Sequence, residues 1–266
     1  MNKKFIPVII VFSSLIVYLF LVSFNFINLN FLGFELKKNQ FKDYFVSITK
    51  TDKSIKVAKK SKKKNKIKIP PKLTPDTSSQ RILIFGDSML EGLGPRLNDY
   101  CEENNHELTQ VVWYSSNTKW YGSCDTIPYY INKVKPTYII LAIGSGDILA
   151  SNALVEREPY VKKILEQIKG YKYVWVGPPN WREDSGINDL IDKTVDKGTF
   201  FLSKNLKFDR VSDGVHPTKA SASKWMDTVA SFIMNKSSNP IMLKSPKKKA
   251  EKRAKFYMLS PKPPVE

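Results

Sequence analysis

The sequence predicts an α/β protein whose core is a parallel sheet of about five strands with helices on both faces. Short apolar runs rich in β-branched and aromatic residues alternate with helix-like segments from residue 81 to residue 234. The runs are continuously apolar, which is typical of strands buried on both faces. Strands that alternate with helices indicate parallel pairing through helical crossovers.

The expected elements follow one another at short intervals. The strands cover residues 81–85, 109–114, 137–143, 172–176 and 199–202. The helices are expected over about 89–104, 124–135, 153–169, 185–197 and 219–234. Glycines stand where two of these helices should end, at Gly170 and Gly198, which suits a left-handed C-cap.

The net charge of +18 belongs to the flanks of this region. Residues 73–235 carry a net charge of −2, whereas residues 51–72 carry +9 and residues 236–266 carry +7. A nucleic-acid groove in the domain is therefore not indicated. We expect residues 26–80 to be a juxtamembrane and basic, Pro-containing linker and residues 236–266 to be a disordered basic tail. A functional alternative for these flanks is electrostatic contact with anionic lipid or an acidic wall polymer.

The N-terminal segment predicts a membrane anchor. Residues 5–24 contain no charged side chain, and a helix of this length spans a bilayer core of about 30 Å. A cleaved signal peptide is the alternative, but bulky residues follow the apolar run where a small-residue cleavage site would be needed. We expect residues 1–25 to form a single-pass transmembrane helix. Lys3 and Lys4 precede it, which favours a cytoplasmic N-terminus and an extracytoplasmic domain.

Five polar loops should open at one edge of the sheet, because the carboxyl ends of parallel strands meet there. These loops are Gly-Asp-Ser (86–88), Ser-Ser-Asn (115–117), Gly-Ser-Gly-Asp (144–147), Gly-Pro-Pro-Asn (177–180) and Ser-Asp-Gly-Val-His-Pro-Thr (212–218). Their convergence, more than any one loop, predicts a functional site at this edge.

Serine chemistry is the strongest interpretation of these loops. Ser88 could cap the helix that follows it, or it could be a nucleophile, which needs a base and a group that orients the base. The chain has two histidines, and His106 lies in a polar stretch that suggests a surface residue away from the loops. His216 lies in the last loop, with Asp213 three residues before it, although Asp213 could instead form a local turn with Gly214.

The Gly-Asp-Ser and Asp-x-x-His blocks resemble those of the SGNH, or GDSL, hydrolase superfamily over residues 81–234. The resemblance implies a three-layer α/β/α sandwich, the flavodoxin-like fold of that family. It also implies that Ser88 is the nucleophile, His216 the general base and Asp213 its orienting partner. Members of the family hydrolyse or transfer acyl groups, often acetyl on sugars, and need no cofactor. The chain also lacks the Cys/His spacing of a zinc site, so no metal is expected.

Two positions depart from the family pattern. The family has Gly in its second block and Asn in its third block. The second position carries Asn117 here, with Gly122 as the less favoured alternative, and the third position carries Gly146. The expected oxyanion hole therefore comprises Ser88, Asn117 and Gly146. Either the Asn117 side chain replaces the missing donor, or Asn117 merely tolerates a left-handed turn.

The substrate is predicted less sharply than the reaction. Trp120 and Trp181 flank the loops and could stack on sugar rings or pack in the core, and Asp147 is a further weak candidate for substrate binding. We expect a membrane-anchored serine esterase that removes acyl groups, acetyl in the first place, from an extracytoplasmic glycan. The alternatives are an O-acyltransferase of the same fold and a catalytically degenerate wall-binding or scaffold protein. Cys101 and Cys124 are expected to be free, partly buried thiols.

Overall fold

The structure is a computed structural model that describes residues 30–31, 34–35 and 73–264. The chain divides into two compact units, residues 1–70 and 71–266. Of the first unit, one short antiparallel pair is described, β1 (Asn30–Phe31) with β2 (Phe34–Glu35). The predicted anchor over residues 1–25 and most of the predicted linker lie outside the described residues.

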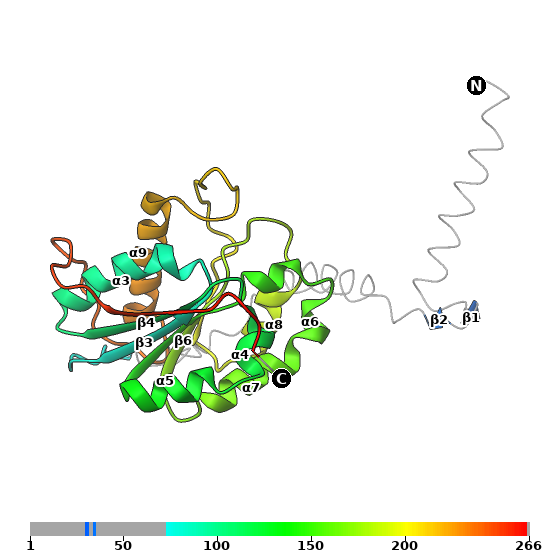
Figure 1. The fold of residues 1–266 in the computed structure, drawn as a ribbon, viewed down its shortest axis with the longest axis horizontal. Helices are drawn as coiled ribbons and strands as arrows, with labels where there is room; N and C mark the ends of the chain where they lie inside the picture. Colours follow the sequence, from blue (N-terminus) through cyan, green and yellow to red (C-terminus); the bar gives the residue numbers. More distant parts are fainter. Residues whose placement is uncertain (1–29, 32–33, 36–72, 265–266) are drawn as a thin grey trace, which may run out of the picture. The chain divides into compact units, whose positions relative to one another are not determined.

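The second unit is a six-stranded parallel sheet with helices on both faces (Figure 1). Its strands are β3 (Arg81–Gly86), β4 (Glu107–Trp113), β5 (Tyr138–Ala142), β6 (Lys172–Val176), β7 (Phe200–Phe201) and β8 (Lys255–Leu259). They are arranged in the order β7-β6-β5-β3-β4-β8, and every neighbouring pair is parallel. The predicted doubly covered α/β sheet is therefore present, with one strand more than expected.

The helices cover the sheet in two layers. They are α3 (Leu90–Glu103), α4 (Thr118–Gly122), α5 (Thr126–Val134), α6 (Ala153–Glu156), α7 (Glu158–Gln167), α8 (Ile187–Thr194) and α9 (Lys219–Asn235), with a 3-10 turn η2 (Gly146–Leu149). Figure 1 shows α3 and α9 on one side of the sheet and α5 and α7 on the other. No described helix is both long and apolar enough to cross a membrane.

Alternate residues of the central strand separate the two cores. Ile82 and Ile84 pack with α3 and α9 in one apolar cluster, whereas Leu83 and Phe85 pack with α5, α7 and α8 in the other. All four side chains are fully buried. This is why the β3 sequence is continuously apolar: both of its faces are covered.

Residues 236–264 are ordered, contrary to the sequence-based expectation of a disordered tail over residues 236–266. Ile241 and Leu243 are buried in the cluster that includes α3 and α9. Residues 255–259 then form β8, which pairs with β4 at the edge of the sheet. The domain also begins before residue 81, because Asp76 pairs with Ile241 in an isolated parallel bridge. The high lysine content indicated disorder, but a few apolar contacts and the pairing of β8 with β4 order this segment.

His106 is a second correction, because it is buried and not a surface residue. Its Nδ1 accepts the backbone N–H of Gln80 at 3.1 Å, and its Nε2 donates to the carbonyl oxygen of Met242 at 2.7 Å. Burial lowers the pKa of the imidazole, which favours the neutral form that this pattern requires. His106 therefore joins the beginning of the domain to its C-terminal segment. Cys101 and Cys124 are free thiols, buried and partly buried respectively, as predicted.

Candidate active site

Ser88 lies in the turn between β3 and α3, where it meets the loop before α9. Its Oγ is 2.8 Å from Nε2 of His216, and Nδ1 of His216 is 2.6 Å from Oδ2 of Asp213. Hydrogen bonds from the His216 side chain, and then from backbone N–H groups, lower the pKa of Asp213 to about 2. The ionised carboxylate holds the proton on Nδ1, which leaves Nε2 to accept the Ser88 hydroxyl. The structure thus brings together the three residues predicted from the sequence.

A tight turn sets the distance between the acid and the base. Oδ1 of Asp213 accepts the N–H groups of Val215 and His216 at 2.7 and 2.9 Å. Gly214, at the centre of the turn, has a φ of +69°, a conformation that glycine adopts without the strain of a side chain. One oxygen of the carboxylate therefore folds the loop, while the other oxygen orients the imidazole. Asp213 therefore does both things considered from the sequence: it forms the local turn and it orients His216.

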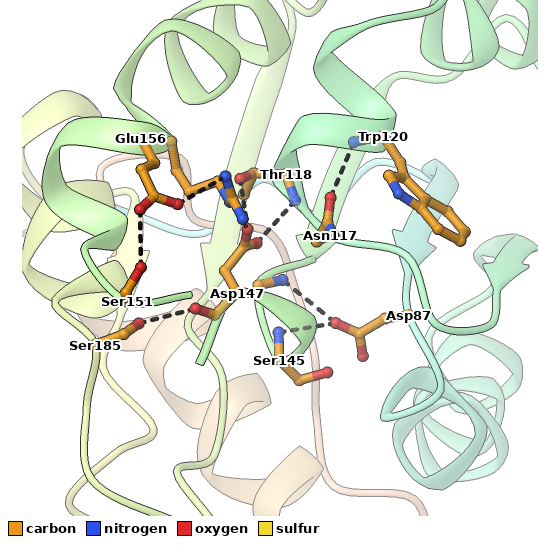
Figure 2. A network of polar contacts seen from close by, with 11 residues as sticks. Asp87, Asn117, Thr118, Trp120, Ser145, Asp147, Ser151, Glu156 and Ser185 are labelled. Carbon is orange, nitrogen blue, oxygen red and sulfur yellow. Dashed lines mark hydrogen bonds and ion pairs between the residues drawn. The ribbon is translucent and has the colours of Figure 1, made fainter. Parts of the chain in front are cut away.

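Asp87, the residue before Ser88, connects two of the loops at the site. It is 2% exposed, and burial raises its pKa. One oxygen accepts the N–H of Met89 at 3.0 Å, and the other accepts those of Gly144 and Ser145 at 3.3 and 3.0 Å (Figure 2). Asp87 thus satisfies an N–H at the start of α3 and joins the first polar loop to the third. Ser88 does not cap the helix, so its hydroxyl is available to the imidazole.

Arg210 holds the loop that carries Asp213 and His216, a role that no sequence motif indicated. Its guanidinium donates to the carbonyl oxygen of Val215, directly before His216, and to that of Asn180 at 2.7 Å. The backbone of the same segment adds a hydrogen bond from Val211 N–H to the His216 carbonyl oxygen at 2.9 Å. One side chain therefore ties the exposed loop to the loop that follows β6. An isolated arginine without a motif gave no signal of this role in the sequence.

Three backbone N–H groups of the predicted oxyanion hole are free. The N–H groups of Ser88, Asn117 and Gly146 donate to no described residue. They belong to the first three polar loops, which follow β3, β4 and β5 at the carboxyl edge of the sheet. Free donors at such an edge can stabilise the negative charge of a tetrahedral intermediate.

Close packing explains why position 146 is glycine. A Cβ at Gly146 would lie 2.6 Å from the carbonyl oxygen of Ser116 and 3.3 Å from Cβ of Asn117. The loop after β4 therefore occupies the space that a side chain at position 146 would need. The asparagine of the family pattern does not fit here without moving this loop.

Asn117 is the N-cap of α4, which neither sequence interpretation foresaw. Its Oδ1 accepts the N–H of Trp120 at 3.0 Å, and its φ of −146° is extended (Figure 2). The left-handed residue of this loop is Ser115, with a φ of +60°, so the turn interpretation of Asn117 is wrong. The capping bond directs the oxygen of the carboxamide to the helix, which leaves Nδ2 without a hydrogen bond to any described residue.

Asp147 is a structural residue, which corrects its assignment as a candidate for substrate binding. Its side chain is 0% exposed. It accepts the Thr118 N–H at 2.8 Å, the Thr118 hydroxyl at 3.0 Å and Nε of Arg157 at 2.8 Å (Figure 2). Burial raises the pKa of Asp147 to about 6, although these three donors oppose the shift. Asp147 thus holds Thr118, the residue after Asn117, in place.

The two candidate aromatic residues are half-buried. The Trp120 ring packs on Trp113 with 5.4 Å between ring centroids. Trp181 packs against both apolar clusters, and the Arg182 guanidinium lies 5.7 Å from its ring centroid. Each has a role in packing and keeps part of its surface open to solvent. Among the described residues, no group of three or more His, Cys, Asp or Glu side chains could hold a metal ion.

Comparisons with known proteins gave matches only among solved structures. No family model matches the chain, and no curated protein matches it. The crystal structure of TesA matches with a TM-score of 0.48 and 17% identity, over 58% of this chain and 98% of TesA. The acetyl xylan esterase AlAXEase matches with a TM-score of 0.44 and 16% identity, over 57% of this chain and 98% of that enzyme.

A Clostridium thermocellum family 3 carbohydrate esterase also matches, with a TM-score of 0.43 and 17% identity, over 56% of this chain and 92% of the esterase. Similarities of this size assign no activity or substrate to this chain. The class is defined by the chain's own geometry: a parallel α/β sandwich carries a Ser–His–Asp chain at its carboxyl edge. It agrees with the arrangement that the resemblance of the Gly-Asp-Ser and Asp-x-x-His blocks implied.

Proposed function

We propose that this protein is a serine esterase that removes acyl groups, acetyl in the first place, from a glycan outside the cytoplasm. The main observation in its support is the continuous chain of hydrogen bonds from Ser88 through His216 to Asp213. A serine becomes nucleophilic when a neutral imidazole accepts its proton and a carboxylate holds the imidazole in that tautomer. The structure has both contacts, that of Ser88 with His216 and that of His216 with Asp213.

The reaction follows from the positions of these groups. Ser88 Oγ attacks the ester carbonyl carbon while Nε2 of His216 takes the hydroxyl proton. The oxyanion that forms accepts hydrogen bonds from the free N–H groups of Ser88, Asn117 and Gly146. Collapse of the intermediate expels the sugar oxygen, which takes the proton from His216, and leaves Ser88 acylated. Water then attacks the acyl-enzyme through the same base and releases the carboxylic acid.

Two features of the chain support the proposed substrate and location. Trp120 and Trp181 leave part of their aromatic surface open, and such surfaces recur in ligand pockets. The uncharged segment over residues 5–24 supports a membrane anchor with the enzyme on the outer side. An anchored enzyme of this kind would act on acylated glycans of the cell envelope.

The decisive experiment compares Ser88→Ala with the unchanged chain on an activated acetyl ester. We expect Ser88→Ala to lower kcat by about 10⁴-fold or more and to abolish labelling by a fluorophosphonate. Ser115→Ala is the matched control, since Ser115 is an exposed serine in another loop of this edge. Unchanged turnover in Ser88→Ala would refute the proposal.

Product analysis then separates hydrolysis from transfer. With an acetylated oligosaccharide as donor, an esterase releases free acetate at the rate at which the donor is consumed. An acyltransferase would release little acetate until an acceptor sugar is added, because water would be a poor acceptor for its acyl-enzyme. Transfer as the main outcome would replace the esterase proposal and keep the assignment of Ser88.

A further inference from the structure

The segment between Leu243 and β8 is the most basic part of the described chain. Residues 244–255, here called the basic strap, carry six lysines, one arginine and one glutamate, for a net charge of +6. Every one of the basic side chains is exposed: Lys244, Lys247, Lys248, Lys249, Lys252, Arg253 and Lys255. Only Lys248 forms an ion pair with a described carboxylate, that of Glu251.

The backbone of the strap is fixed by side chains of α3. Asp99 accepts the N–H of Ala250 at 2.9 Å. Glu102 accepts the N–H groups of Glu251 and Lys252 at 3.0 Å, and these bonds lower the pKa of Glu102. Asp99 and Glu102 therefore hold the backbone of the strap, and the basic side chains of the strap are exposed to solvent.

Exposed apolar side chains follow the strap on β8. Phe256 is 47% exposed and Met258 is 59% exposed. Their register partners on β4 are Gln110 and Val112, and Val112 faces the cluster of α3 and α9. Tyr257 points the other way and packs on the cluster of α5 and α7. Phe256 and Met258 thus lie on the α3 side of an edge strand, beside the basic strap.

We propose that the basic strap and β8 form a docking surface for an anionic lipid bilayer. Clustered lysines gain about 1 kcal/mol each near a negatively charged membrane surface. Exposed aromatic and thioether side chains gain further by entering the boundary between headgroups and acyl chains. The lysines of the strap supply the electrostatic contribution, and Phe256 with Met258 supplies the apolar contribution. An anionic bilayer is a partner that uses both.

Two other partners, a second copy of this chain and a soluble polyanion, fit this surface less well. A second copy could pair with the free edge of β8, but lysines on an edge strand oppose such pairing by like-charge repulsion. A soluble polyanion would use the ammonium groups alone, because it offers nothing to Phe256 and Met258. The combination of cations and exposed apolar side chains therefore favours a bilayer.

The test uses residues 71–266, a compact unit that contains both apolar clusters. Omitting residues 1–70 removes the apolar segment over residues 5–24, which would bind lipid by itself. Co-sedimentation is measured with vesicles of phosphatidylcholine and with vesicles that also contain phosphatidylglycerol. The unit is expected to bind the anionic vesicles, to bind the neutral vesicles far more weakly, and to be released by salt.

Charge variants test the strap. Replacing Lys247, Lys248 and Lys249 by serine should weaken binding to the anionic vesicles by about 100-fold, since each lost lysine costs about fivefold. The matched control replaces Lys162, Lys163 and Lys169 by serine, which changes the net charge equally at exposed positions in and just after α7. Equal losses in the two triple variants would overturn the proposal, because net charge and not the strap would then determine binding.

Apolar variants distinguish the bilayer from a polyanion. The double variant Phe256→Ser with Met258→Ser should bind the anionic vesicles about 20-fold more weakly and bind soluble polyphosphate as the unchanged unit does. Leu149→Ser with Val155→Ser is the matched control at other exposed apolar positions and should bind normally. Vesicle binding that is unaffected by loss of Phe256 and Met258 would overturn the lipid assignment in favour of a polyanion.

Sedimentation of residues 71–266 without lipid tests whether this surface binds a second copy of the chain. A dimer that dissociates in the Phe256→Ser, Met258→Ser variant would overturn the proposal in favour of a second copy. Thermal denaturation of each variant checks that the fold is retained. Lipid binding is measured directly, so this proposal stands or fails independently of the esterase activity.

Discussion

Asn117 offers the sharpest test of the proposed oxyanion hole, in which Gly146 stands where the family pattern has asparagine. Its Oδ1 caps α4 through the Trp120 N–H, and its Nδ2 has no described partner. The loop of Asn117 packs closely on Gly146, since Asn117 Cβ lies only 3.3 Å from where a Cβ at position 146 would be. We therefore expect Nδ2 of Asn117 to replace the missing donor when the oxyanion forms.

Two substitutions separate the cap from the donor. Asn117→Ser keeps an oxygen that can cap α4, because serine is a good N-cap, but removes Nδ2. Asn117→Ala removes both groups. Loss of one oxyanion donor lowers kcat by about 10²–10³-fold, which corresponds to about 3–4 kcal/mol, whereas loss of a cap lowers the free energy of unfolding by about 1 kcal/mol.

Both variants should therefore lose kcat to the same extent, with KM little changed, because the lost contact belongs to the transition state. Only Asn117→Ala should also unfold at lower temperature. Steady-state kinetics on an activated acetyl ester and thermal denaturation measure the two effects. A normal kcat in Asn117→Ser, with a lower melting temperature in Asn117→Ala, would show that Asn117 is only a cap.

Other residues and segments lead to further expected outcomes. Gly146→Asn should lower the free energy of unfolding by about 1–3 kcal/mol without raising kcat. The reason is that the new Cβ would lie 2.6 Å from the Ser116 carbonyl oxygen. A variant that is as stable as the unchanged chain and has a higher kcat would contradict this packing argument. Arg210→Ala should lower kcat about 10²-fold by releasing the catalytic loop, and added guanidinium ion should restore part of it; a loss of melting temperature with normal kcat would limit Arg210 to stability. A fragment of residues 71–235 lacks β8 and should show no cooperative melting transition by circular dichroism, in contrast to residues 71–266.

The central part of the fold and the triad could be predicted from the sequence because their signals are local. Residues 81–85 are apolar without interruption because both faces of β3 are covered. Ser88 follows this strand directly, and Asp213 and His216 lie within one turn of backbone. Parallel pairing then brings such loops to one edge whatever the details of packing.

Other features depend on contacts between residues far apart in the chain. β8 has a basic flank and one solvent-exposed face, so its composition resembles a tail, and only its pairing with β4 makes it a strand. His106 stands in a polar stretch but is buried by the segments that contain Gln80 and Met242. In each case a polar local sequence is ordered by partners that the sequence does not place nearby.

The roles of individual polar residues at the site were also decided by the tertiary structure. Asp147 resembled a residue that could face a substrate, but Thr118 and Arg157 enclose it. Arg210 belongs to no motif, yet it holds the loop directly before His216. A sequence pattern identifies which side chains can do chemistry. Whether such a side chain faces solvent, substrate or another residue depends on packing, because burial and hydrogen-bond partners are properties of the assembled layers.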